Sequence, residues 1–267
     1  MAQNTANAYP TPKPRMPVLD RGHEMVRCGL TAGFPFYERG GGVVHDVVGK
    51  RVGTLTNGPT WRLNSLGSAV VFDGTDDVIT TNANCLGQNS GTVSAWLYFG
   101  AGISTSDFNV ICSTTHPIFN LYVLSNGNYI MSAINGYEQK YTVPRSPEYF
   151  ILNRYHHVVW VYDKAVARSD VYYDGSLLAE AFITGTWGSA SLGTTLRIGC
   201  DTSSLYAWDG DIAEIRFYNR ALSQQQVRKL YTDAWGIYIP VKRMFGKAPA
   251  GFYSRYYYDM AGGGAAC

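Results

Sequence analysis

From residue 68 onward, apolar and polar residues alternate in short runs that are separated by glycine, asparagine and aspartate. The run 91–100, "GTVSAWLYFG", alternates and is rich in β-branched and aromatic residues, which is typical of a strand. Residues 119–134 ("FNLYVLSNGNYIMSAI") and 169–183 ("SDVYYDGSLLAEAFI") read as hairpins that turn at Asn126-Gly127 and Asp174-Gly175. Such pairs favour two-residue turns because both central positions need a positive φ.

Five further runs have the same character, and each is short and bounded by turn residues. They are "SAVVFDG" (68–74), "DVITT" (77–81), "YHHVVWVYD" (155–163), "TTLRIGC" (194–200) and "DIAEIRFYN" (211–219). Many short strands with turns between them predict an all-β fold built as a sandwich or a barrel.

One segment, "ALSQQQVRKLYTD", has a helical pattern instead. Ser223 is a favourable N-cap, and Gln226 three residues later completes a capping box. Leu222 and Val227 form a hydrophobic staple around this start. The pattern predicts a helix over residues 224–232.

The two ends of the chain lack a sustained period. Residues 1–18 are rich in proline, which favours an extended, polyproline-like segment. Residues after 233 contain aromatics and glycines without a repeat. We therefore expect an N-terminal arm over 1–28, one domain over 29–233 and a C-terminal arm over 234–267.

Composition narrows the class of protein. The 267 residues are 14% aromatic and only 16% charged, with a net charge of +2; both ends are basic and the body is mildly acidic. This balance permits docking on acidic surfaces but is too weak to indicate nucleic-acid binding. We see no secretory h-region and no apolar run long enough for a membrane span, which predicts synthesis in a cytoplasm.

The five cysteines are far apart and odd in number. They are Cys28, Cys85, Cys112, Cys200 and Cys267, and no two form a Cys-x-x-Cys pair. This spacing argues against a zinc site and against a disulfide framework, so we expect free thiols.

His156 and His157 are neighbours on a predicted strand. Successive side chains of a strand point to opposite faces, so the two imidazoles cannot hold one metal ion together. We expect a structural role for both, with one side chain facing the core and the other facing outward.

At this point five blocks of the chain, in order, resemble a known family. "GLTAGFPFYERGGG", "GSAVVFDGTDDVI", "YHHVVWVYDKAVARSDVYYDGS", "LRIGC" and "GDIAEIRFYNRALSQQQVRKLY" are similar to the conserved blocks of laminin-G-like, concanavalin A-like jelly rolls. The resemblance covers about residues 29–233. It implies two packed antiparallel sheets, one of them concave, in a jelly-roll sandwich with a short C-terminal helix.

The resemblance also implies a site for calcium beside a binding surface. The candidate ligands are Asp73, Asp76 and Asp77, because calcium prefers several hard oxygens. The family usually has an aspartate where this chain has Ala213, and the alternative is a tight turn with aspartate caps. No other cofactor is expected.

Relatives of this fold include β-glucan hydrolases and lectins. Asp209, Asp211 and Glu214 in "DGDIAE" resemble a catalytic strand of carboxylates, although the first residue departs from that pattern. A glycoside hydrolase is therefore the third of three functional hypotheses.

The second hypothesis is a lectin-like module for host or surface attachment. Its candidate glycan-binding residues are the loop aromatics Trp187, Tyr206 and Trp208.

The preferred reading is a non-enzymatic structural and adhesion protein whose arms dock on neighbouring subunits. "YTDAWGIYIPVKRMF" resembles the ending of laminin-G-like proteins of tailed phages, which implies a virion component such as a capsid decoration protein. Its partners would be capsid protein and copies of itself, without nucleic acid or membrane. Aromatic and arginine side chains are enriched at binding hot spots, so the expected docking residues are Trp235, Tyr238, Arg243, Phe245, Arg255 and Tyr256.

Overall fold

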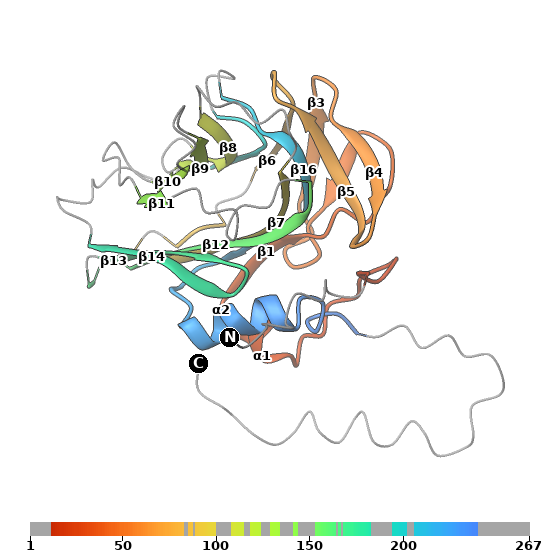
Figure 1. The fold of residues 1–267 in the computed structure, drawn as a ribbon. Coiled ribbons are helices and arrows are strands. Elements are labelled where there is room, and N and C mark those ends of the chain that lie inside the picture. The colour runs from red at the N-terminus through yellow and green to blue at the C-terminus, as the bar shows by residue number, and fades with distance from the viewer. Residues whose placement is uncertain are drawn as a thin grey trace, which may run out of the picture.

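The computed structural model describes residues 12–82, 85–87, 89–99, 108–114, 118–123, 129–133, 141–143, 153–163, 165–166, 168–182, 194–201 and 206–239. Two antiparallel sheets pack face to face, with two short helices beside one of them (Figure 1). The first sheet has the order β14-β13-β12-β7-β16-β5-β4, and β1 also pairs with β16. The second has the order β11-β10-β9-β8-β15-β6-β3-β2. The predicted jelly-roll sandwich is confirmed.

The elements have the following bounds: α1 Glu24–Arg27, β1 Leu30–Phe34, β2 Val43–His45, β3 Val52–Thr56, β4 Thr60–Asn64, β5 Gly67–Asp73, β6 Val78–Asn82, β7 Ser90–Phe99, β8 Phe108–Ser113, β9 Ile118–Val123, β10 Tyr129–Ala133, β11 Tyr141–Val143, β12 Tyr155–Asp163, β13 Arg168–Tyr173, β14 Ser176–Phe182, β15 Thr195–Ile198, β16 Asp209–Tyr218 and α2 Gln224–Thr232.

The predicted turns and caps occur where the sequence places them. α2 spans the predicted residues, and Ser223 and Gln226 form the reciprocal capping box. Asp174 and Gly175 both have positive φ, 46° and 76°, in the turn between β13 and β14. Asn126 and Gly127 lie outside the described residues, but the strands on either side of them, β9 and β10, pair antiparallel.

The space between the two sheets forms the main core. Residues from strands of both sheets point into it, among them Phe34, Phe72, Phe99 and Trp160, all nearly inaccessible to solvent. Burial of such large side chains is the main favourable contribution to folding, at about 25 cal/mol per Å² of apolar area.

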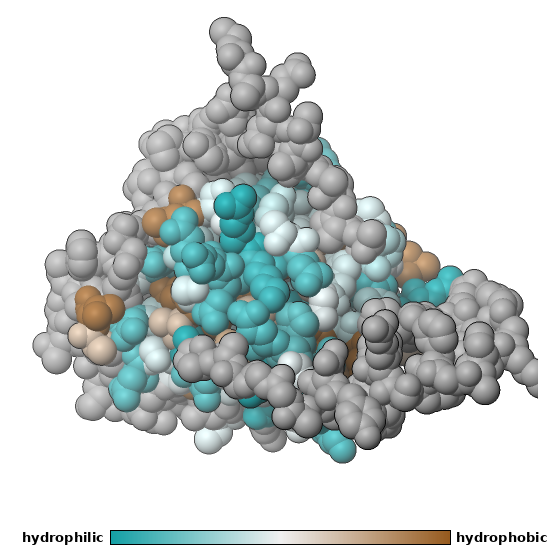
Figure 2. All heavy atoms as spheres, turned by 90° about the horizontal axis from the view of Figure 1, so that it is seen from below, coloured by the Kyte–Doolittle hydropathy of each residue, from teal (hydrophilic) through white to brown (hydrophobic). Residues whose placement is uncertain are grey.

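A second apolar layer covers the other face of the first sheet. α1 and α2 lie below this sheet (Figure 1) and bury Trp96, Val159 and Tyr172 of its strands. Every residue of β12 up to Tyr162 is therefore buried, so both faces of this strand are covered. The surface seen from the helical side is mainly hydrophilic, with a few separate hydrophobic areas (Figure 2).

This second layer corrects one expectation about the paired histidines. His156 and His157 do point to opposite faces, but each is only 1% exposed. His156 stacks on Tyr173 in the main core, while His157 packs against Trp96 under α2. The outward position predicted for one of them is wrong because the helical layer covers that face.

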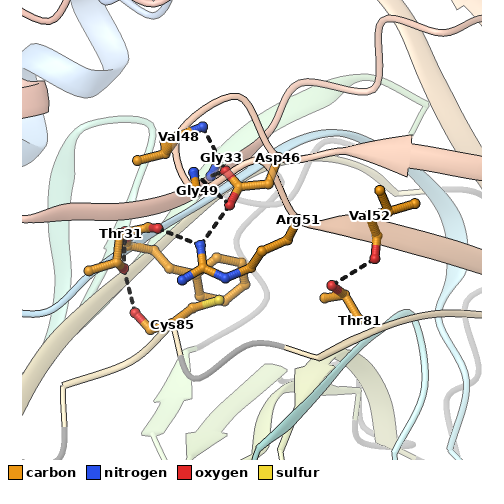
Figure 3. Close-up of polar contacts among 10 residues, drawn as sticks. Thr31, Gly33, Asp46, Val48, Gly49, Arg51, Val52, Thr81 and Cys85 are labelled. Atoms are coloured by element: carbon orange, nitrogen blue, oxygen red, sulfur yellow. Dashed lines mark hydrogen bonds and ion pairs between the residues drawn. The ribbon is translucent and has the colours of Figure 1, made fainter.

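A buried carboxylate connects β1 to the hairpin of β2 and β3 (Figure 3). Asp46 accepts hydrogen bonds from the backbone of Gly33, Val48 and Gly49. Arg51 donates to Asp46 at 2.7 Å and to the carbonyl of Thr31 at 2.8 Å. The carboxylate is fully used by these partners, which identifies it as a structural group rather than a free acid.

Three cysteines, Cys85, Cys112 and Cys200, are buried free thiols, as the sequence predicts. Cys28 is disulfide-bonded, so the expectation of a free thiol is wrong for it.

The described parts of both predicted arms lie on the sandwich. Leu19 and Tyr238 form a β-bridge, and backbone hydrogen bonds join Asp20 to Ile237 and Ile239 to Val18. The extended conformation expected for residues 12–28 is interrupted by α1. The domain boundaries at 28/29 and 233/234 stay predictions. No helix of the described residues is long and apolar enough to cross a membrane.

Candidate functional site

The three aspartates expected to bind calcium come together at one rim of the sandwich. Asp73 ends β5, and Asp76 and Asp77 precede β6. One carboxylate oxygen of each lies within 4.8 Å of the others. We call this group, Asp73, Asp76 and Asp77, the acidic turn. The sequence pattern therefore identified a cluster that the fold assembles.

Hydrogen bonds hold the acidic turn in shape. Asp73 accepts from the backbone of Thr75, and Asp77 accepts from the backbone of Asp73. Asn57 donates its carboxamide to the carbonyl of Asp76. The backbone of Gly74, which has a φ of 77°, donates to the carbonyl of Trp208. These contacts place the turn directly against the start of β16.

That neighbouring strand adds a fourth carboxylate, which sequence reasoning did not assign to this site. Asp209 is the register partner of Asp73 across β16 and β5. Burial, and then the charge of Asp73, raises the pKa of Asp209. Burial also raises the pKa of Asp77, with added repulsion from Asp73 and Asp76.

One atom of the turn has no protein partner. Asp77 is 2% exposed, and its Oδ1 is buried without a hydrogen bond among the described residues. Burying a carboxylate oxygen without a hydrogen bond costs free energy. A bound cation would give this oxygen a partner and remove that cost. The three carboxylates of the acidic turn are the hard oxygen donors that calcium prefers. The residues present therefore fit a calcium ion, even with Ala213 at the family's usual aspartate position.

The loop aromatics expected to bind glycan differ in their placement. Tyr206 is half-buried and lies three residues before Asp209 along the chain. Trp208 is fully buried in the main core and packs edge-on against Phe99. Its ring cannot stack on a sugar, so that prediction is wrong for Trp208. Trp187 lies outside the described residues.

Two of the expected docking residues are buried within the chain. Trp235 packs against Trp96, with ring centroids 6.2 Å apart, and Tyr238 donates its hydroxyl to Glu214. They are 8% and 3% exposed, so they cannot be a surface for a partner. The described part of the C-terminal arm covers the first sheet instead. The other four, Arg243, Phe245, Arg255 and Tyr256, lie outside the described residues.

The three carboxylates that resemble a catalytic strand do not converge. Asp209 belongs with the acidic turn, and Asp211 forms an ion pair with Arg62 on the outer face of the sheet. Glu214 pairs with Arg216 at 2.6 Å in a buried position. The register shift between Ile212 and Glu214 leaves Asp211 opposite Tyr98 and Glu214 opposite Trp96 on β7. Asp211 and Glu214 are thus each engaged by an arginine, whereas Asp209 faces the like charge of Asp73.

A buried lysine from the N-terminal segment was not anticipated. Lys13 is 5% exposed, and its Nζ donates to the carbonyls of Pro35, Ser68 and Ala213. Burial lowers its pKa to about 7, although the charge of Glu214 acts in the opposite direction. A lone lysine in a proline-rich segment carries no sequence signal for such a position.

These features define a class of protein, a two-sheet jelly-roll domain with a cluster of carboxylates at its rim. The family model described as the concanavalin A-like lectin/glucanases superfamily matches residues 73–228. The chain therefore belongs to this superfamily. A search of curated proteins gives no match.

Solved structures with the same fold include enzymes and binding domains. One is Domain 4 of AbnA, an extracellular arabinanase from Geobacillus stearothermophilus, and this domain was solved in complex with arabinotriose. Its TM-score is 0.58 at 17% sequence identity, and the alignment covers 76% of this chain and 98% of that domain. The binding domain of Paraclostridial Mosquitocidal Protein 1 has a TM-score of 0.61 at 11% identity, covering 77% of this chain and 52% of that one. A Trypanosoma rangeli sialidase has a TM-score of 0.56 at 16% sequence identity, and the alignment covers 79% of this chain and 34% of the sialidase chain. At these identities the likeness shows the fold alone.

Proposed function

We propose that this protein is a non-enzymatic, lectin-like binding protein that holds a glycan at the rim formed by the acidic turn, through a calcium ion. The superfamily and the arabinotriose-bound structural neighbour support a carbohydrate ligand. The separate engagement of Asp209, Asp211 and Glu214 supports binding without hydrolysis.

The observation that carries the proposal is the unpartnered Oδ1 of Asp77 inside a cluster of carboxylates. Calcium takes six to eight oxygen ligands, more than these carboxylates supply singly, so sugar hydroxyls and water can complete the shell. Asp73, Asp76 and Asp77 would hold the ion, with Asp209 beside them as the register partner of Asp73. Tyr206, three residues before Asp209, is the candidate contact for a bound sugar.

The experiment is a glycan array probed with the full chain in calcium and in EDTA. Asp77→Asn is the test variant, because it removes one ligand charge and keeps the size of the side chain. Asp163→Asn, which changes a carboxylate at the far end of β12, is the matched control. We expect calcium-dependent retention that Asp77→Asn abolishes and Asp163→Asn preserves. Retention that ignores both EDTA and Asp77→Asn would refute the rim site.

A second candidate function is assembly into a larger particle such as a virion, with the distal arms as contacts. It is favoured by the pairing of Leu19 with Tyr238, which brings the described parts of both arms together. Met16, Val18 and Ile239 are 72%, 55% and 46% exposed beside that pairing, so apolar surface is available where the arms begin. Extended segments of this kind can add strands or side-chain anchors to a neighbour.

Light scattering on the full chain and on residues 12–239 tests this second function. The shorter form keeps every described contact of Lys13 and Tyr238, so it retains the packed core. Assembly is supported if the full chain forms a larger species and the shorter form is a monomer. Equal masses, with residues 240–267 cleaved freely by protease in the presence of particles, would contradict it.

A further inference from the structure

A polar and aromatic cluster on the outer face of the first sheet takes no part in the acidic turn. At its centre lies Asp211 of β16, which is 1% exposed. Its carboxylate accepts two contacts from Arg62 Nη1, at 3.0 and 3.2 Å, and one from the Tyr155 hydroxyl at 2.6 Å. Asn64 donates to that same hydroxyl oxygen at 2.6 Å. The buried carboxylate is fully occupied and acts as a support for the groups around it.

These contacts fix the guanidinium of Arg62 in one orientation. The side chain is 50% exposed although one of its nitrogens is bound to a buried acid. Its carbon Cζ lies 6.0 Å from the centroid of the Tyr98 ring. The remaining nitrogens, Nε and Nη2, make no hydrogen bond to the described residues, so they stay available on a rigid fork.

The neighbouring groups on the surface extend this set. Tyr98 is half-buried, and its ring lies 5.3 Å from that of Tyr155. The Tyr98 hydroxyl makes a long contact, 3.4 Å, with Oδ1 of Asn153. Asn153 is exposed, and its φ of 63° is held by a hydrogen bond from its backbone to Phe99. An aromatic ring is therefore flanked by a guanidinium on one side and a carboxamide on the other.

From this geometry we infer a second binding site, formed by Arg62, Tyr98 and Asn153, that takes an uncharged sugar unit. The half-exposed ring of Tyr98 offers an apolar face to the C–H groups of a sugar ring. The nitrogens of Arg62 and the carboxamide of Asn153 donate to its hydroxyl oxygens. The inference rests on the proposed glycan-binding function and adds a ligand class and a site that needs no metal ion.

The charges favour an uncharged ligand over an anionic one. The positive charge of Arg62 acts to lower the pKa of both Asp211 and Tyr155. The carboxylate of Asp211 balances that charge. The pair therefore presents fixed hydrogen-bond donors with no net charge to attract an anion. Such donors give direction and selectivity to neutral hydroxyl groups, which ordered side chains bind at a low entropic cost.

The test uses the full chain on an array of neutral and acidic glycans, in calcium and in EDTA. Arg62→Ala and Tyr98→Ala remove the donors and the ring. Asn153→Gly removes the exposed carboxamide while keeping a residue that accepts positive φ, so it is the variant least able to disturb folding. Leu63→Ala is the matched control, because Leu63 is 65% exposed on the opposite side of the same strand. Thermal unfolding of each variant confirms that it is folded.

We expect the native chain to retain neutral glycans in EDTA. The variants Asp77→Asn and Leu63→Ala should retain them as well. Arg62→Ala and Tyr98→Ala should weaken this retention more than about 10-fold, and Asn153→Gly by a few fold, in line with the loss of one or two hydrogen bonds. Neutral binding unchanged in all three folded variants would overturn the site. Binding lost with Asp77→Asn alone would leave the rim proposal standing and refute this one. Retention of acidic glycans alone would refute the ligand class, and no retention at all would refute both proposals.

Discussion

Asp73 and Asp209 lie directly opposite each other on the neighbouring antiparallel strands β5 and β16. Like charges in this position repel and destabilise a sheet. The turn that follows Asp73 brings two further carboxylates to the same place, and a bound cation would turn this repulsion into attraction. If the proposed calcium ion binds here, the pairing would couple the stability of the rim to the metal ion.

The first prediction follows from this coupling. Asp209→Asn removes one of two opposed charges, so in EDTA it should raise the free energy of unfolding by about 0.5–1 kcal/mol. Calcium should raise the Tm of the native chain by several degrees and that of the variant by less. Differential scanning calorimetry with and without calcium measures both. Asp20→Asn, a turn carboxylate far from the rim, should behave as the native chain does.

The second prediction concerns Lys13. Lys13→Met leaves three buried carbonyls without their donor. Each unsatisfied buried group lowers the free energy of unfolding by about 1–3 kcal/mol. We expect a loss of about 3 kcal/mol in urea unfolding and faster proteolysis before Gly22. Arg15→Met changes an exposed cation in the same segment and should leave both unchanged. Equal stability of the two variants would show that the Lys13 contacts contribute nothing.

The third prediction is a pH dependence that comes from His157. Burial lowers its pKa to about 3, and its Nδ1 is buried without a partner while Ser94 lies 2.8 Å from Nε2. The folded state therefore keeps the imidazole neutral, whereas the unfolded chain takes up a proton near pH 6.5. Stability is complete above pH 6.5 and falls as the pH drops toward 3, by up to about 5 kcal/mol.

Urea unfolding at pH 7.5, 5.5 and 4.5 measures this slope. His157→Gln removes the titrating group, so its stability should fall less between pH 7.5 and 4.5 than that of the native chain. His45→Gln is the control, because His45 is exposed and pairs with Glu38 at the surface. Parallel slopes for all three proteins would mean that His157 does not control the acid sensitivity.

The fourth prediction separates a buried ion pair from an exposed one. Glu214 and Arg216 are each 2% exposed, and Arg216 also donates to the carbonyl of Ala234. Arg216→Met should cost about 3–5 kcal/mol because it leaves the charge of Glu214 uncompensated in the interior. Lys229→Met breaks the surface pair with Glu24 and should cost less than about 1 kcal/mol. Chemical denaturation of both variants provides the comparison.

Local patterns account for the elements that the sequence predicted correctly. The capping box at Ser223 and the turn at Asp174-Gly175 depend on neighbouring residues, so they are visible in the sequence. The acidic turn is also local, because its three aspartates lie within five positions of one another. Such features need no knowledge of the rest of the fold.

The errors arise where distant segments meet. Trp208 looks like a loop aromatic, but the β-bridge between Cys200 and Ala207 leads it into the core. Trp235 and Tyr238 look like free docking residues, but Trp96 and Glu214 of the sheet bury them. An aromatic side chain gives the same sequence signal whether it packs inside its own chain or on a partner.

The sequence by itself determined the all-β class, the helix at 224–232 and the carboxylates of the acidic turn, because each depends on alternation, caps or short spacing. Tertiary structure alone decided that Asp209 joins the turn, that Lys13 reaches three carbonyls, and that Arg62 rests on Asp211. The three contacts of Lys13 alone join residues that are 22, 55 and 200 positions apart in the sequence. The pairing register of the sheets sets them, and register comes from the packing of the whole core rather than from any local run.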